Sequence, residues 1–211
     1  MMNQFIDDFY DILFKPAVGM ARITKERSIW QGLLVYLAIS IVSTITTVGA
    51  TGTADYAGEL SQFVSPEVAT TILRSLPVLN LLAILVFTPF LLFISAAILQ
   101  FSAELLGGRG KGLQLAAGLG YAQLPYILVA PFGLVARYLN FNVVVVVSFA
   151  VFIWAIVLKI EAIRAVFGFS HRRAALTYFL PVLAILVAIV IFLLLMFSFL
   201  MPLMSQLFPI S

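Results

Sequence analysis

Five long apolar stretches alternate with short polar segments along this chain. They lie near residues 29–48, 77–101, 113–136, 143–160 and 176–201. A helix needs about 20 apolar residues to cross about 30 Å of hydrocarbon, and the stretches reach or approach that length. Strands of a transmembrane barrel would instead alternate apolar and polar positions in pieces of about ten residues. The pattern therefore predicts an all-α fold, a polytopic membrane bundle of five transmembrane helices.

The composition of the chain also indicates that it is surrounded by a lipid bilayer. Of its 211 residues, 63% are hydrophobic and 10% are charged. Soluble domains average about 45–50% apolar residues and about 25% charged residues. We expect residues 29–211 to form a membrane domain and residues 1–28 a separate cytoplasmic segment with no cleavable signal peptide. The chain has no cysteine, which excludes disulfides, thiolate metal sites and cysteine nucleophiles. Its small positive charge gives no support for nucleic-acid binding.

The placement of lysine and arginine predicts the topology. Almost all of these residues lie before the first span, between spans 2 and 3, or between spans 4 and 5. Basic residues are concentrated in cytoplasmic segments of membrane proteins. We therefore expect a multi-pass protein of the cell membrane with its N-terminus in the cytoplasm and its C-terminus outside.

The segment before the first span has the periodicity of an amphipathic helix. Residues 3–14 place five apolar side chains on one stripe: Phe5, Ile6, Phe9, Leu13 and Phe14. Three aspartates lie opposite: Asp7, Asp8 and Asp11. Asp11 and Lys15 have the i, i+4 spacing of an ion pair, and Pro16 interrupts or restarts the helix. We expect an interfacial cytoplasmic helix that either docks on the end of the bundle or binds a partner.

The longest connection, residues 49–75, contains a helix start. Ser65, Pro66 and Glu67 supply a capping hydroxyl, a proline in the first turn and an acid near the helix N-terminus. We expect a short helix through Val68, Ile72 and Leu73 on the outer surface, where it can cover the bundle or engage an external partner.

Polar and small residues recur within spans 2 and 3. The candidate intramembrane polar seam comprises Thr88, Ser95, Gly120, Tyr121, Gln123 and Pro125. Small and polar residues at helical spacing let membrane helices approach closely and form hydrogen bonds, so we expect spans 2 and 3 to pack face to face with Gln123 bonded inside the bundle. Pro89, Pro125 and Pro131 should bend these helices. The seam can serve ordinary packing or line a substrate path.

Charged residues gather where spans 4 and 5 meet the cytoplasm. This candidate cytoplasmic patch comprises Lys159, Glu161, Arg164, Arg172 and Arg173. Glu161 and Arg164 have the i, i+3 spacing of an ion pair, and Lys159 can extend toward the surface. The residues can be ordinary interface charges or a functional surface.

The sequence predicts no catalytic, cofactor or metal site. His171 is the single histidine, and its neighbour Ser170 diverges from it by about 100° on a helix. The glycine-rich run 107–112 lacks the preceding strand and the Ser or Thr of a phosphate-binding loop. We expect no enzyme activity and no cofactor.

Three motifs resemble the Yip family, the five-span membrane proteins named for their interaction with Ypt/Rab GTPases. They are Leu13-Phe-Lys-Pro16 with Ile23, Gly120-Tyr121-Ala-Gln-Leu-Pro125, and Ile163-Arg164-Ala-Val-Phe-Gly168-Phe-Ser170 followed by Arg173-Ala174-Ala175. The resemblance implies a cytoplasmic N-terminus, an exposed C-terminus and, in eukaryotic relatives, roles in vesicle trafficking and GTPase recruitment. The short N-terminal segment is similar to the prokaryotic branch. Lys15 stands where the eukaryotic motif has glycine before proline, which argues against GTPase binding.

These observations favour a non-enzymatic membrane scaffold or interaction module. Its partners would be the lipid bilayer and a protein at the cytoplasmic face, and a homo-oligomer is left open. The alternative is a small transporter or permease-like protein with a path between spans 2 and 3.

Overall fold

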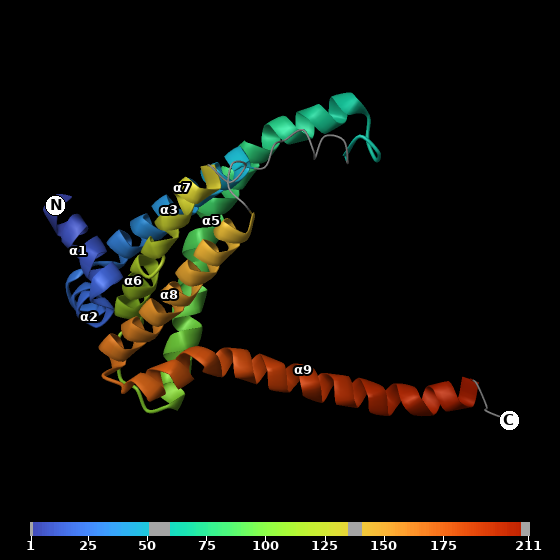
Figure 1. The fold of residues 1–211 in the computed structure, drawn as a ribbon. Coiled ribbons are helices and arrows are strands. Elements are labelled where there is room, and N and C mark those ends of the chain that lie inside the picture. Colours follow the sequence, from blue (N-terminus) through green and yellow to red (C-terminus); the bar gives the residue numbers. More distant parts are fainter. Residues whose placement is uncertain (1, 51–59, 135–140, 208–211) are drawn as a thin grey trace.

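The computed structural model describes residues 2–50, 60–134 and 141–207, and within these ranges every regular element is a helix (Figure 1). The elements are α1 (Met2–Phe14), α2 (Pro16–Glu26), α3 (Ile29–Ala50), α5 (Pro66–Leu105), α6 (Gly112–Tyr121), the 3-10 helix η1 (Leu124–Leu128), α7 (Val129–Leu134), α8 (Phe141–Phe167) and α9 (His171–Leu207).

Five segments are long and apolar enough to cross a membrane, which confirms the number of predicted spans. They are Ile29–Thr46, Pro66–Leu105, Gly112–Phe132, Val145–Phe167 and His171–Met201. The chain is an integral membrane protein with a helical bundle. In Figure 1, α3, α6 and α8 run side by side, and α1 and α2 lie at one end of them.

The second span extends well beyond the predicted range. The helix begins at Pro66 after Ser65, as the sequence predicts, but it continues without a break to Leu105. Its 40 residues correspond to about 60 Å, twice the hydrocarbon thickness. The expected separate helix on the outer surface is therefore wrong. Pro77 and Pro89 lie inside α5 without ending it, and its first turns project away from the bundle (Figure 1).

The third span is broken, where the sequence predicted one bent helix over 113–136. Its α-helix α6 ends at Tyr121, the chain passes through η1, and α7 follows from Val129. Pro125 explains the break because it has no backbone N–H and its ring collides with the carbonyl four residues earlier. It occupies the first turn of η1, where the missing donor leaves no bond unmade. The end of the predicted span, 135–136, lies outside the described residues.

The small residues of the third span contact the first span more closely than the second. A Cβ added to Gly32 of α3 would lie 2.7 Å from the Ala117 Cα of α6, and one added to Gly120 would collide with the Gly32 carbonyl. Helix α6 also packs against α5, so spans 2 and 3 are neighbours. The close approach that was expected between spans 2 and 3, however, is made between spans 1 and 3, because only glycine at both positions lets two backbones come so near.

The buried core lies toward the end of the bundle that carries α1 and α2. Its members come from all the main helices: Ile12, Met20, Ile23, Leu33, Leu99, Leu115, Leu119, Leu124, Leu158 and Ile163. Helix α9 contributes to this core only through its first turns. It then leaves the bundle (Figure 1), and residues 182–201 are exposed throughout.

Candidate functional site

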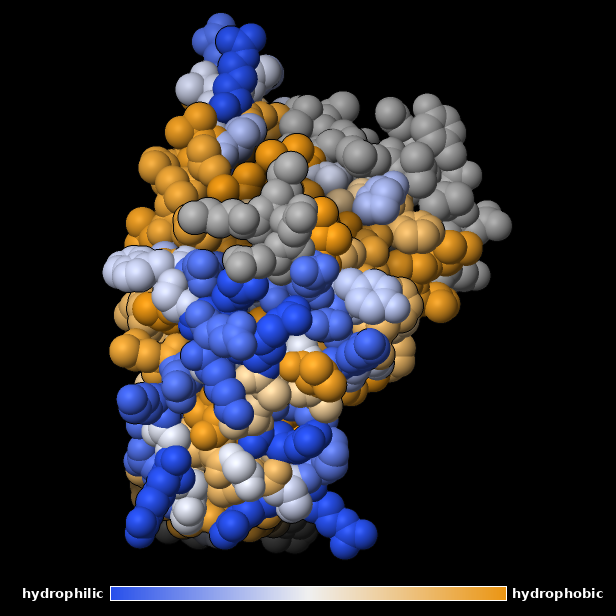
Figure 2. All heavy atoms as spheres, turned by 90° about the vertical axis from the view of Figure 1, so that its left-hand side faces the viewer, coloured by the Kyte–Doolittle hydropathy of each residue, from blue (hydrophilic) through white to orange (hydrophobic). Residues whose placement is uncertain are grey.

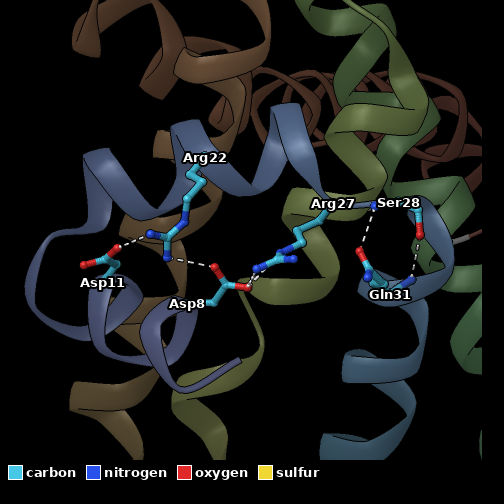
Figure 3. Close-up of polar contacts among 6 residues, drawn as sticks. All are labelled: Asp8, Asp11, Arg22, Arg27, Ser28 and Gln31. Carbon is cyan, nitrogen blue, oxygen red and sulfur yellow. Dashed lines mark hydrogen bonds and ion pairs between the residues drawn. The ribbon is translucent and has the colours of Figure 1, made fainter. Parts of the chain in front are cut away.

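Helices α1 and α2 form a hairpin whose charged side chains converge on Asp8. The Asp8 side chain is 1% exposed, and its two carboxylate oxygens accept hydrogen bonds from Arg22 at 2.8 Å and from the Arg27 Nε at 2.8 Å. Arg22 also pairs with Asp11 at 2.9 Å. Figure 3 shows Asp8 between the two arginines. Two carboxylates are therefore paired with two guanidinium groups. Such pairing compensates the cost of burying the Asp8 carboxylate.

The Arg22 guanidinium reflects the same balance. Burial acts to lower its pKa, but the hydrogen bond to Asp8 and the charges of Asp8, Asp11 and Glu26 outweigh burial and raise the pKa above its usual value. Arg22 thus stays charged at any physiological pH. We call Asp8, Asp11, Arg22 and Arg27 the aspartate cluster.

The aspartate cluster corrects the predicted orientation of the first helix. Asp8 was expected on the polar outer side, yet it is buried, and Asp11 pairs with Arg22 where a pair with Lys15 was expected. Ile12 is fully buried, whereas Ile6, Tyr10 and Phe14 are 53–68% exposed. The periodicity of residues 3–14 could not reveal this arrangement, because the arginines that neutralise Asp8 come from later in the chain.

An apolar stripe therefore faces outward from the hairpin. Ile6, Tyr10 and Phe14 recur every four residues, and Val18 at the start of α2 is also exposed. The rings of Tyr10 and Phe14 lie 4.9 Å apart between centroids. We call these four residues the α1 stripe. Figure 2 views the side on which α1 and α2 lie in Figure 1, and hydrophilic residues gather over the middle and lower part of this face, with hydrophobic residues above.

The turn into the first span carries a cap that the sequence reading missed. The Ser28 backbone N–H donates to Gln31 Oε1 at 3.0 Å, and the Gln31 N–H donates to Ser28 Oγ at 3.4 Å (Figure 3). This is the capping-box arrangement, and Ser-x-x-Gln before an apolar run is its recognisable signal. It fixes the direction in which α3 leaves the aspartate cluster.

A groove of about 600 Å³ runs from Asp8 and Arg27 along α3 to Val42.

A second site lies inside the bundle, where five helices meet. It is a cavity of about 260 Å³ whose polar lining residues are Tyr36, Ser95, Gln123, Lys159 and Tyr178. Within the described part of the chain, the Gln123 side chain makes no hydrogen bond, so it faces this cavity without the bonded partner we expected. Lys159 was expected at the surface and instead lines the same cavity. We call this site the Lys159 cavity.

The structure distributes the predicted polar seam over several places. Ser95 and Gln123 line the Lys159 cavity. Gly120 contacts α3, and Tyr121 lines the groove beside Asp8. Thr88 is buried in α5 and Pro125 is buried at the start of η1. The seam is thus not one surface, because the break after α6 turns its residues in different directions.

The predicted pair of Glu161 and Arg164 forms at 2.6 Å. Glu161 is buried, and its second oxygen lies 3.1 Å from His171 Nδ1, while Arg164 Nη1 lies 3.0 Å from His171 Nε2. These contacts match a neutral imidazole that donates from Nδ1 and accepts at Nε2. The cluster joins the last turns of α8 to the start of α9.

Near Glu161 and His171, the connection between α5 and α6 packs against the connection between α8 and α9. Gly108 and Gly110 lie so close to Phe167 and Phe169 that an added Cβ would approach the rings to 2.7–2.8 Å. The Arg173 guanidinium lies 4.8 Å from the centre of the Phe169 ring. Exposed cations of the α5–α6 connection and of the first turn of α9 share this end of the bundle: Arg109, Lys111, Arg172 and Arg173. The patch residues Arg172 and Arg173 thus join Arg109 and Lys111, while Lys159 belongs to the cavity.

Metal chemistry has no candidate site in the residues that the structure describes, where no group of three His, Cys, Asp or Glu side chains could hold an ion. Comparison with known proteins finds one family. The family model described as Yip1 domain matches residues 10–206. No curated protein and no solved structure matches the chain.

Proposed function

The chain belongs to the Yip1 domain family, and on that premise we propose that it is a non-enzymatic membrane scaffold that binds a protein partner at its cytoplasmic face. The observation that carries this proposal is the exposed α1 stripe on a hairpin whose two helices are joined by ion pairs to the buried Asp8. We place the protein in a prokaryotic cell membrane, in line with Lys15, which stands where the eukaryotic motif has glycine.

The orientation follows from the basic residues. Arg109, Lys111, Arg172 and Arg173 gather at the end of the bundle that also carries α2. Such a concentration of cations is typical of the cytoplasmic side. An odd number of spans then places the C-terminus on the other side. The hairpin and the basic connections would together form one cytoplasmic surface.

The hairpin has the properties of a contact surface. Its inner side is fixed, because Asp8 is buried and bound by two arginines. Its outer side exposes Tyr10 and Phe14, which are 53% and 68% exposed. Exposed apolar patches rimmed by polar residues mark interaction sites, and aromatic residues are enriched at such sites. A rigid support with an apolar outer stripe favours a binding role over catalysis.

The test is site-specific photocrosslinking in native membranes. A photoreactive phenylalanine analogue replaces Tyr10 in one variant and the exposed Glu26 of α2 in a matched control. We expect a discrete protein adduct from position 10, no such adduct from position 26, and loss of the position-10 adduct when Phe14→Ser is added. Adducts with lipid alone would refute a protein partner at the α1 stripe.

One observation favours the alternative of a small transporter. The Lys159 cavity places an ionisable group and an amide inside the bundle, beside spans 2 and 3. Polar groups at membrane depth often mark a substrate path. Replacing Gln123 by Leu separates the two functions, because it would disable a transporter and leave a scaffold intact.

A further inference from the structure

We propose that the Lys159 cavity binds the phosphate of an anionic membrane phospholipid. This binding site goes beyond the scaffold function and does not depend on the α1 stripe. Three features of the cavity carry the inference: an unpaired cation, several hydrogen-bond donors around it, and an apolar flank that faces the bilayer.

The first feature is charge. Among the residues that the structure describes, none forms an ion pair or hydrogen bond with Lys159. The nearest acid along α8, Glu161, is already bound by Arg164 and His171. A charge within a membrane span is costly unless it is paired. An anion in the cavity would supply the missing partner.

The second feature is the chemistry of the walls. Tyr36, Tyr178 and Ser95 bring hydroxyl groups to the cavity, and Gln123 brings an amide. Each of these groups can donate a hydrogen bond, and phosphate oxygens accept several at once. The Gln123 side chain makes no bond to the described residues, so its donors are available. Each polar side chain that lines the cavity can therefore donate a hydrogen bond to a phosphate oxygen, and no carboxylate is among the described lining residues.

The third feature identifies the source of the phosphate. The cavity holds about 260 Å³, which suits a headgroup and leaves no room for acyl chains. Its wall includes the exposed apolar residues Ile98 of α5 and Val182 of α9. Beyond Val182, α9 diverges from the bundle and leaves an apolar flank on both helices (Figure 1). Acyl chains can lie along this flank while the phosphate reaches Lys159.

The depth of the site agrees with a headgroup position. Lys159 precedes the end of α8 at Phe167 by eight residues, or about 12 Å along the helix. Basic pockets between membrane helices on the cytoplasmic side are known to bind anionic headgroups. The Lys159 cavity opens near that side if the basic connections are cytoplasmic.

The test measures lipid retention by the purified full-length protein. Wild type, Lys159→Gln and the matched control Lys111→Gln, which removes an exposed loop lysine, are mixed with phosphatidylglycerol or phosphatidylcholine and analysed by native mass spectrometry. We expect wild type and Lys111→Gln to retain phosphatidylglycerol preferentially. Lys159→Gln should lose about tenfold in affinity, the effect of one charge-assisted hydrogen bond.

Two further measurements test the proposal independently of how Lys159→Gln folds. Tyr178→Phe, which preserves the ring and removes one donor, should weaken retention severalfold even if Lys159→Gln fails to fold. Inorganic phosphate should compete only weakly, because it lacks acyl chains. Equal retention by wild type and Lys159→Gln, equal loss in Lys111→Gln, or full displacement by inorganic phosphate would each overturn the proposal. None of these outcomes bears on crosslinking at Tyr10.

Discussion

The aspartate cluster and the Lys159 cavity both contain charged side chains but differ in how these charges are balanced. In the cluster, Asp8 and Asp11 meet Arg22 and Arg27, so the buried charges neutralise one another. In the cavity, Lys159 meets no acid of the described chain and lies among hydroxyl and amide groups. Breaking a closed network of buried ion pairs leaves an uncompensated charge, so the network favours one arrangement of the helices. A cation left open toward a cavity is instead suited to a ligand.

The largest effect should come from breaking the closed network. Asp8→Asn leaves two arginines beside a neutral amide, and breaking a buried ion pair by changing one partner costs about 3–5 kcal/mol. The free energy of unfolding, measured by SDS titration in micelles, should fall by about that amount. Asp7→Asn, at the exposed neighbouring position, is the control and should change little. An equal effect of the two changes would contradict the role of Asp8.

Removing the unpaired charge of Lys159 should raise the free energy of unfolding, the opposite of the effect of Asp8→Asn. Lys159→Met replaces a cation by an apolar side chain of similar length, and a charge at membrane depth costs about 2.5–3.5 kcal/mol. In micelles without anionic lipid, we expect unfolding to become harder by about 1–3 kcal/mol, because part of that cost is relieved. The same SDS titration measures it. Destabilisation comparable with Asp8→Asn would show that Lys159 has a structural partner.

A smaller change is expected at the amide of the cavity. Gln123→Leu should be neutral or stabilising by up to about 1 kcal/mol, because its side chain makes no hydrogen bond that would be lost. Thermal unfolding with and without phosphatidylglycerol measures the effect, and the stabilisation by lipid should decrease in the variant. A marked loss of stability without lipid would mean that Gln123 has an internal partner.

The smallest change should come from the α8–α9 contact. The His171 side chain is 70% exposed, and exposed polar contacts contribute only about 0–1 kcal/mol even when both groups are charged. His171→Ala should therefore lower the free energy of unfolding by about 0.5 kcal/mol or less. Glu161→Gln, which alters a buried acid in the same cluster, should cost more. If His171→Ala proved the more damaging variant, the contact would be central to the fold.

The five spans could be predicted because bilayer thickness sets a length that apolar runs must meet. The start of α5 was also predictable, since Pro66 favours the first turn of a helix, although the Ser65 side chain does not make the capping hydrogen bond that the sequence predicted. Its continuity was not, because nothing local shows whether the helix continues past Pro77. The break after Tyr121 required knowing that Pro125 would end the helix, whereas Pro89 leaves α5 continuous.

The sites depended on contacts between distant residues. The pair of Glu161 and Arg164 was predictable because it forms within one helical turn. The burial of Asp8 was not, because Arg27 lies 19 positions away and its approach depends on the hairpin. The Lys159 cavity likewise joins Gln123 from one span to Lys159 from another. Polar periodicity within each span could identify Gln123 as unusual without showing what it would face.

The divergence of α9 bears on how the protein is made. The buried core is complete once the first turns of α9 have packed on α5 and α8, and residues 182–201 add nothing to it. This stretch of about 30 Å matches the hydrocarbon thickness by itself. During synthesis it would enter the lipid as an independent hydrophobic rod after the other four spans had assembled, so a chain truncated after residue 181 should still assemble its core.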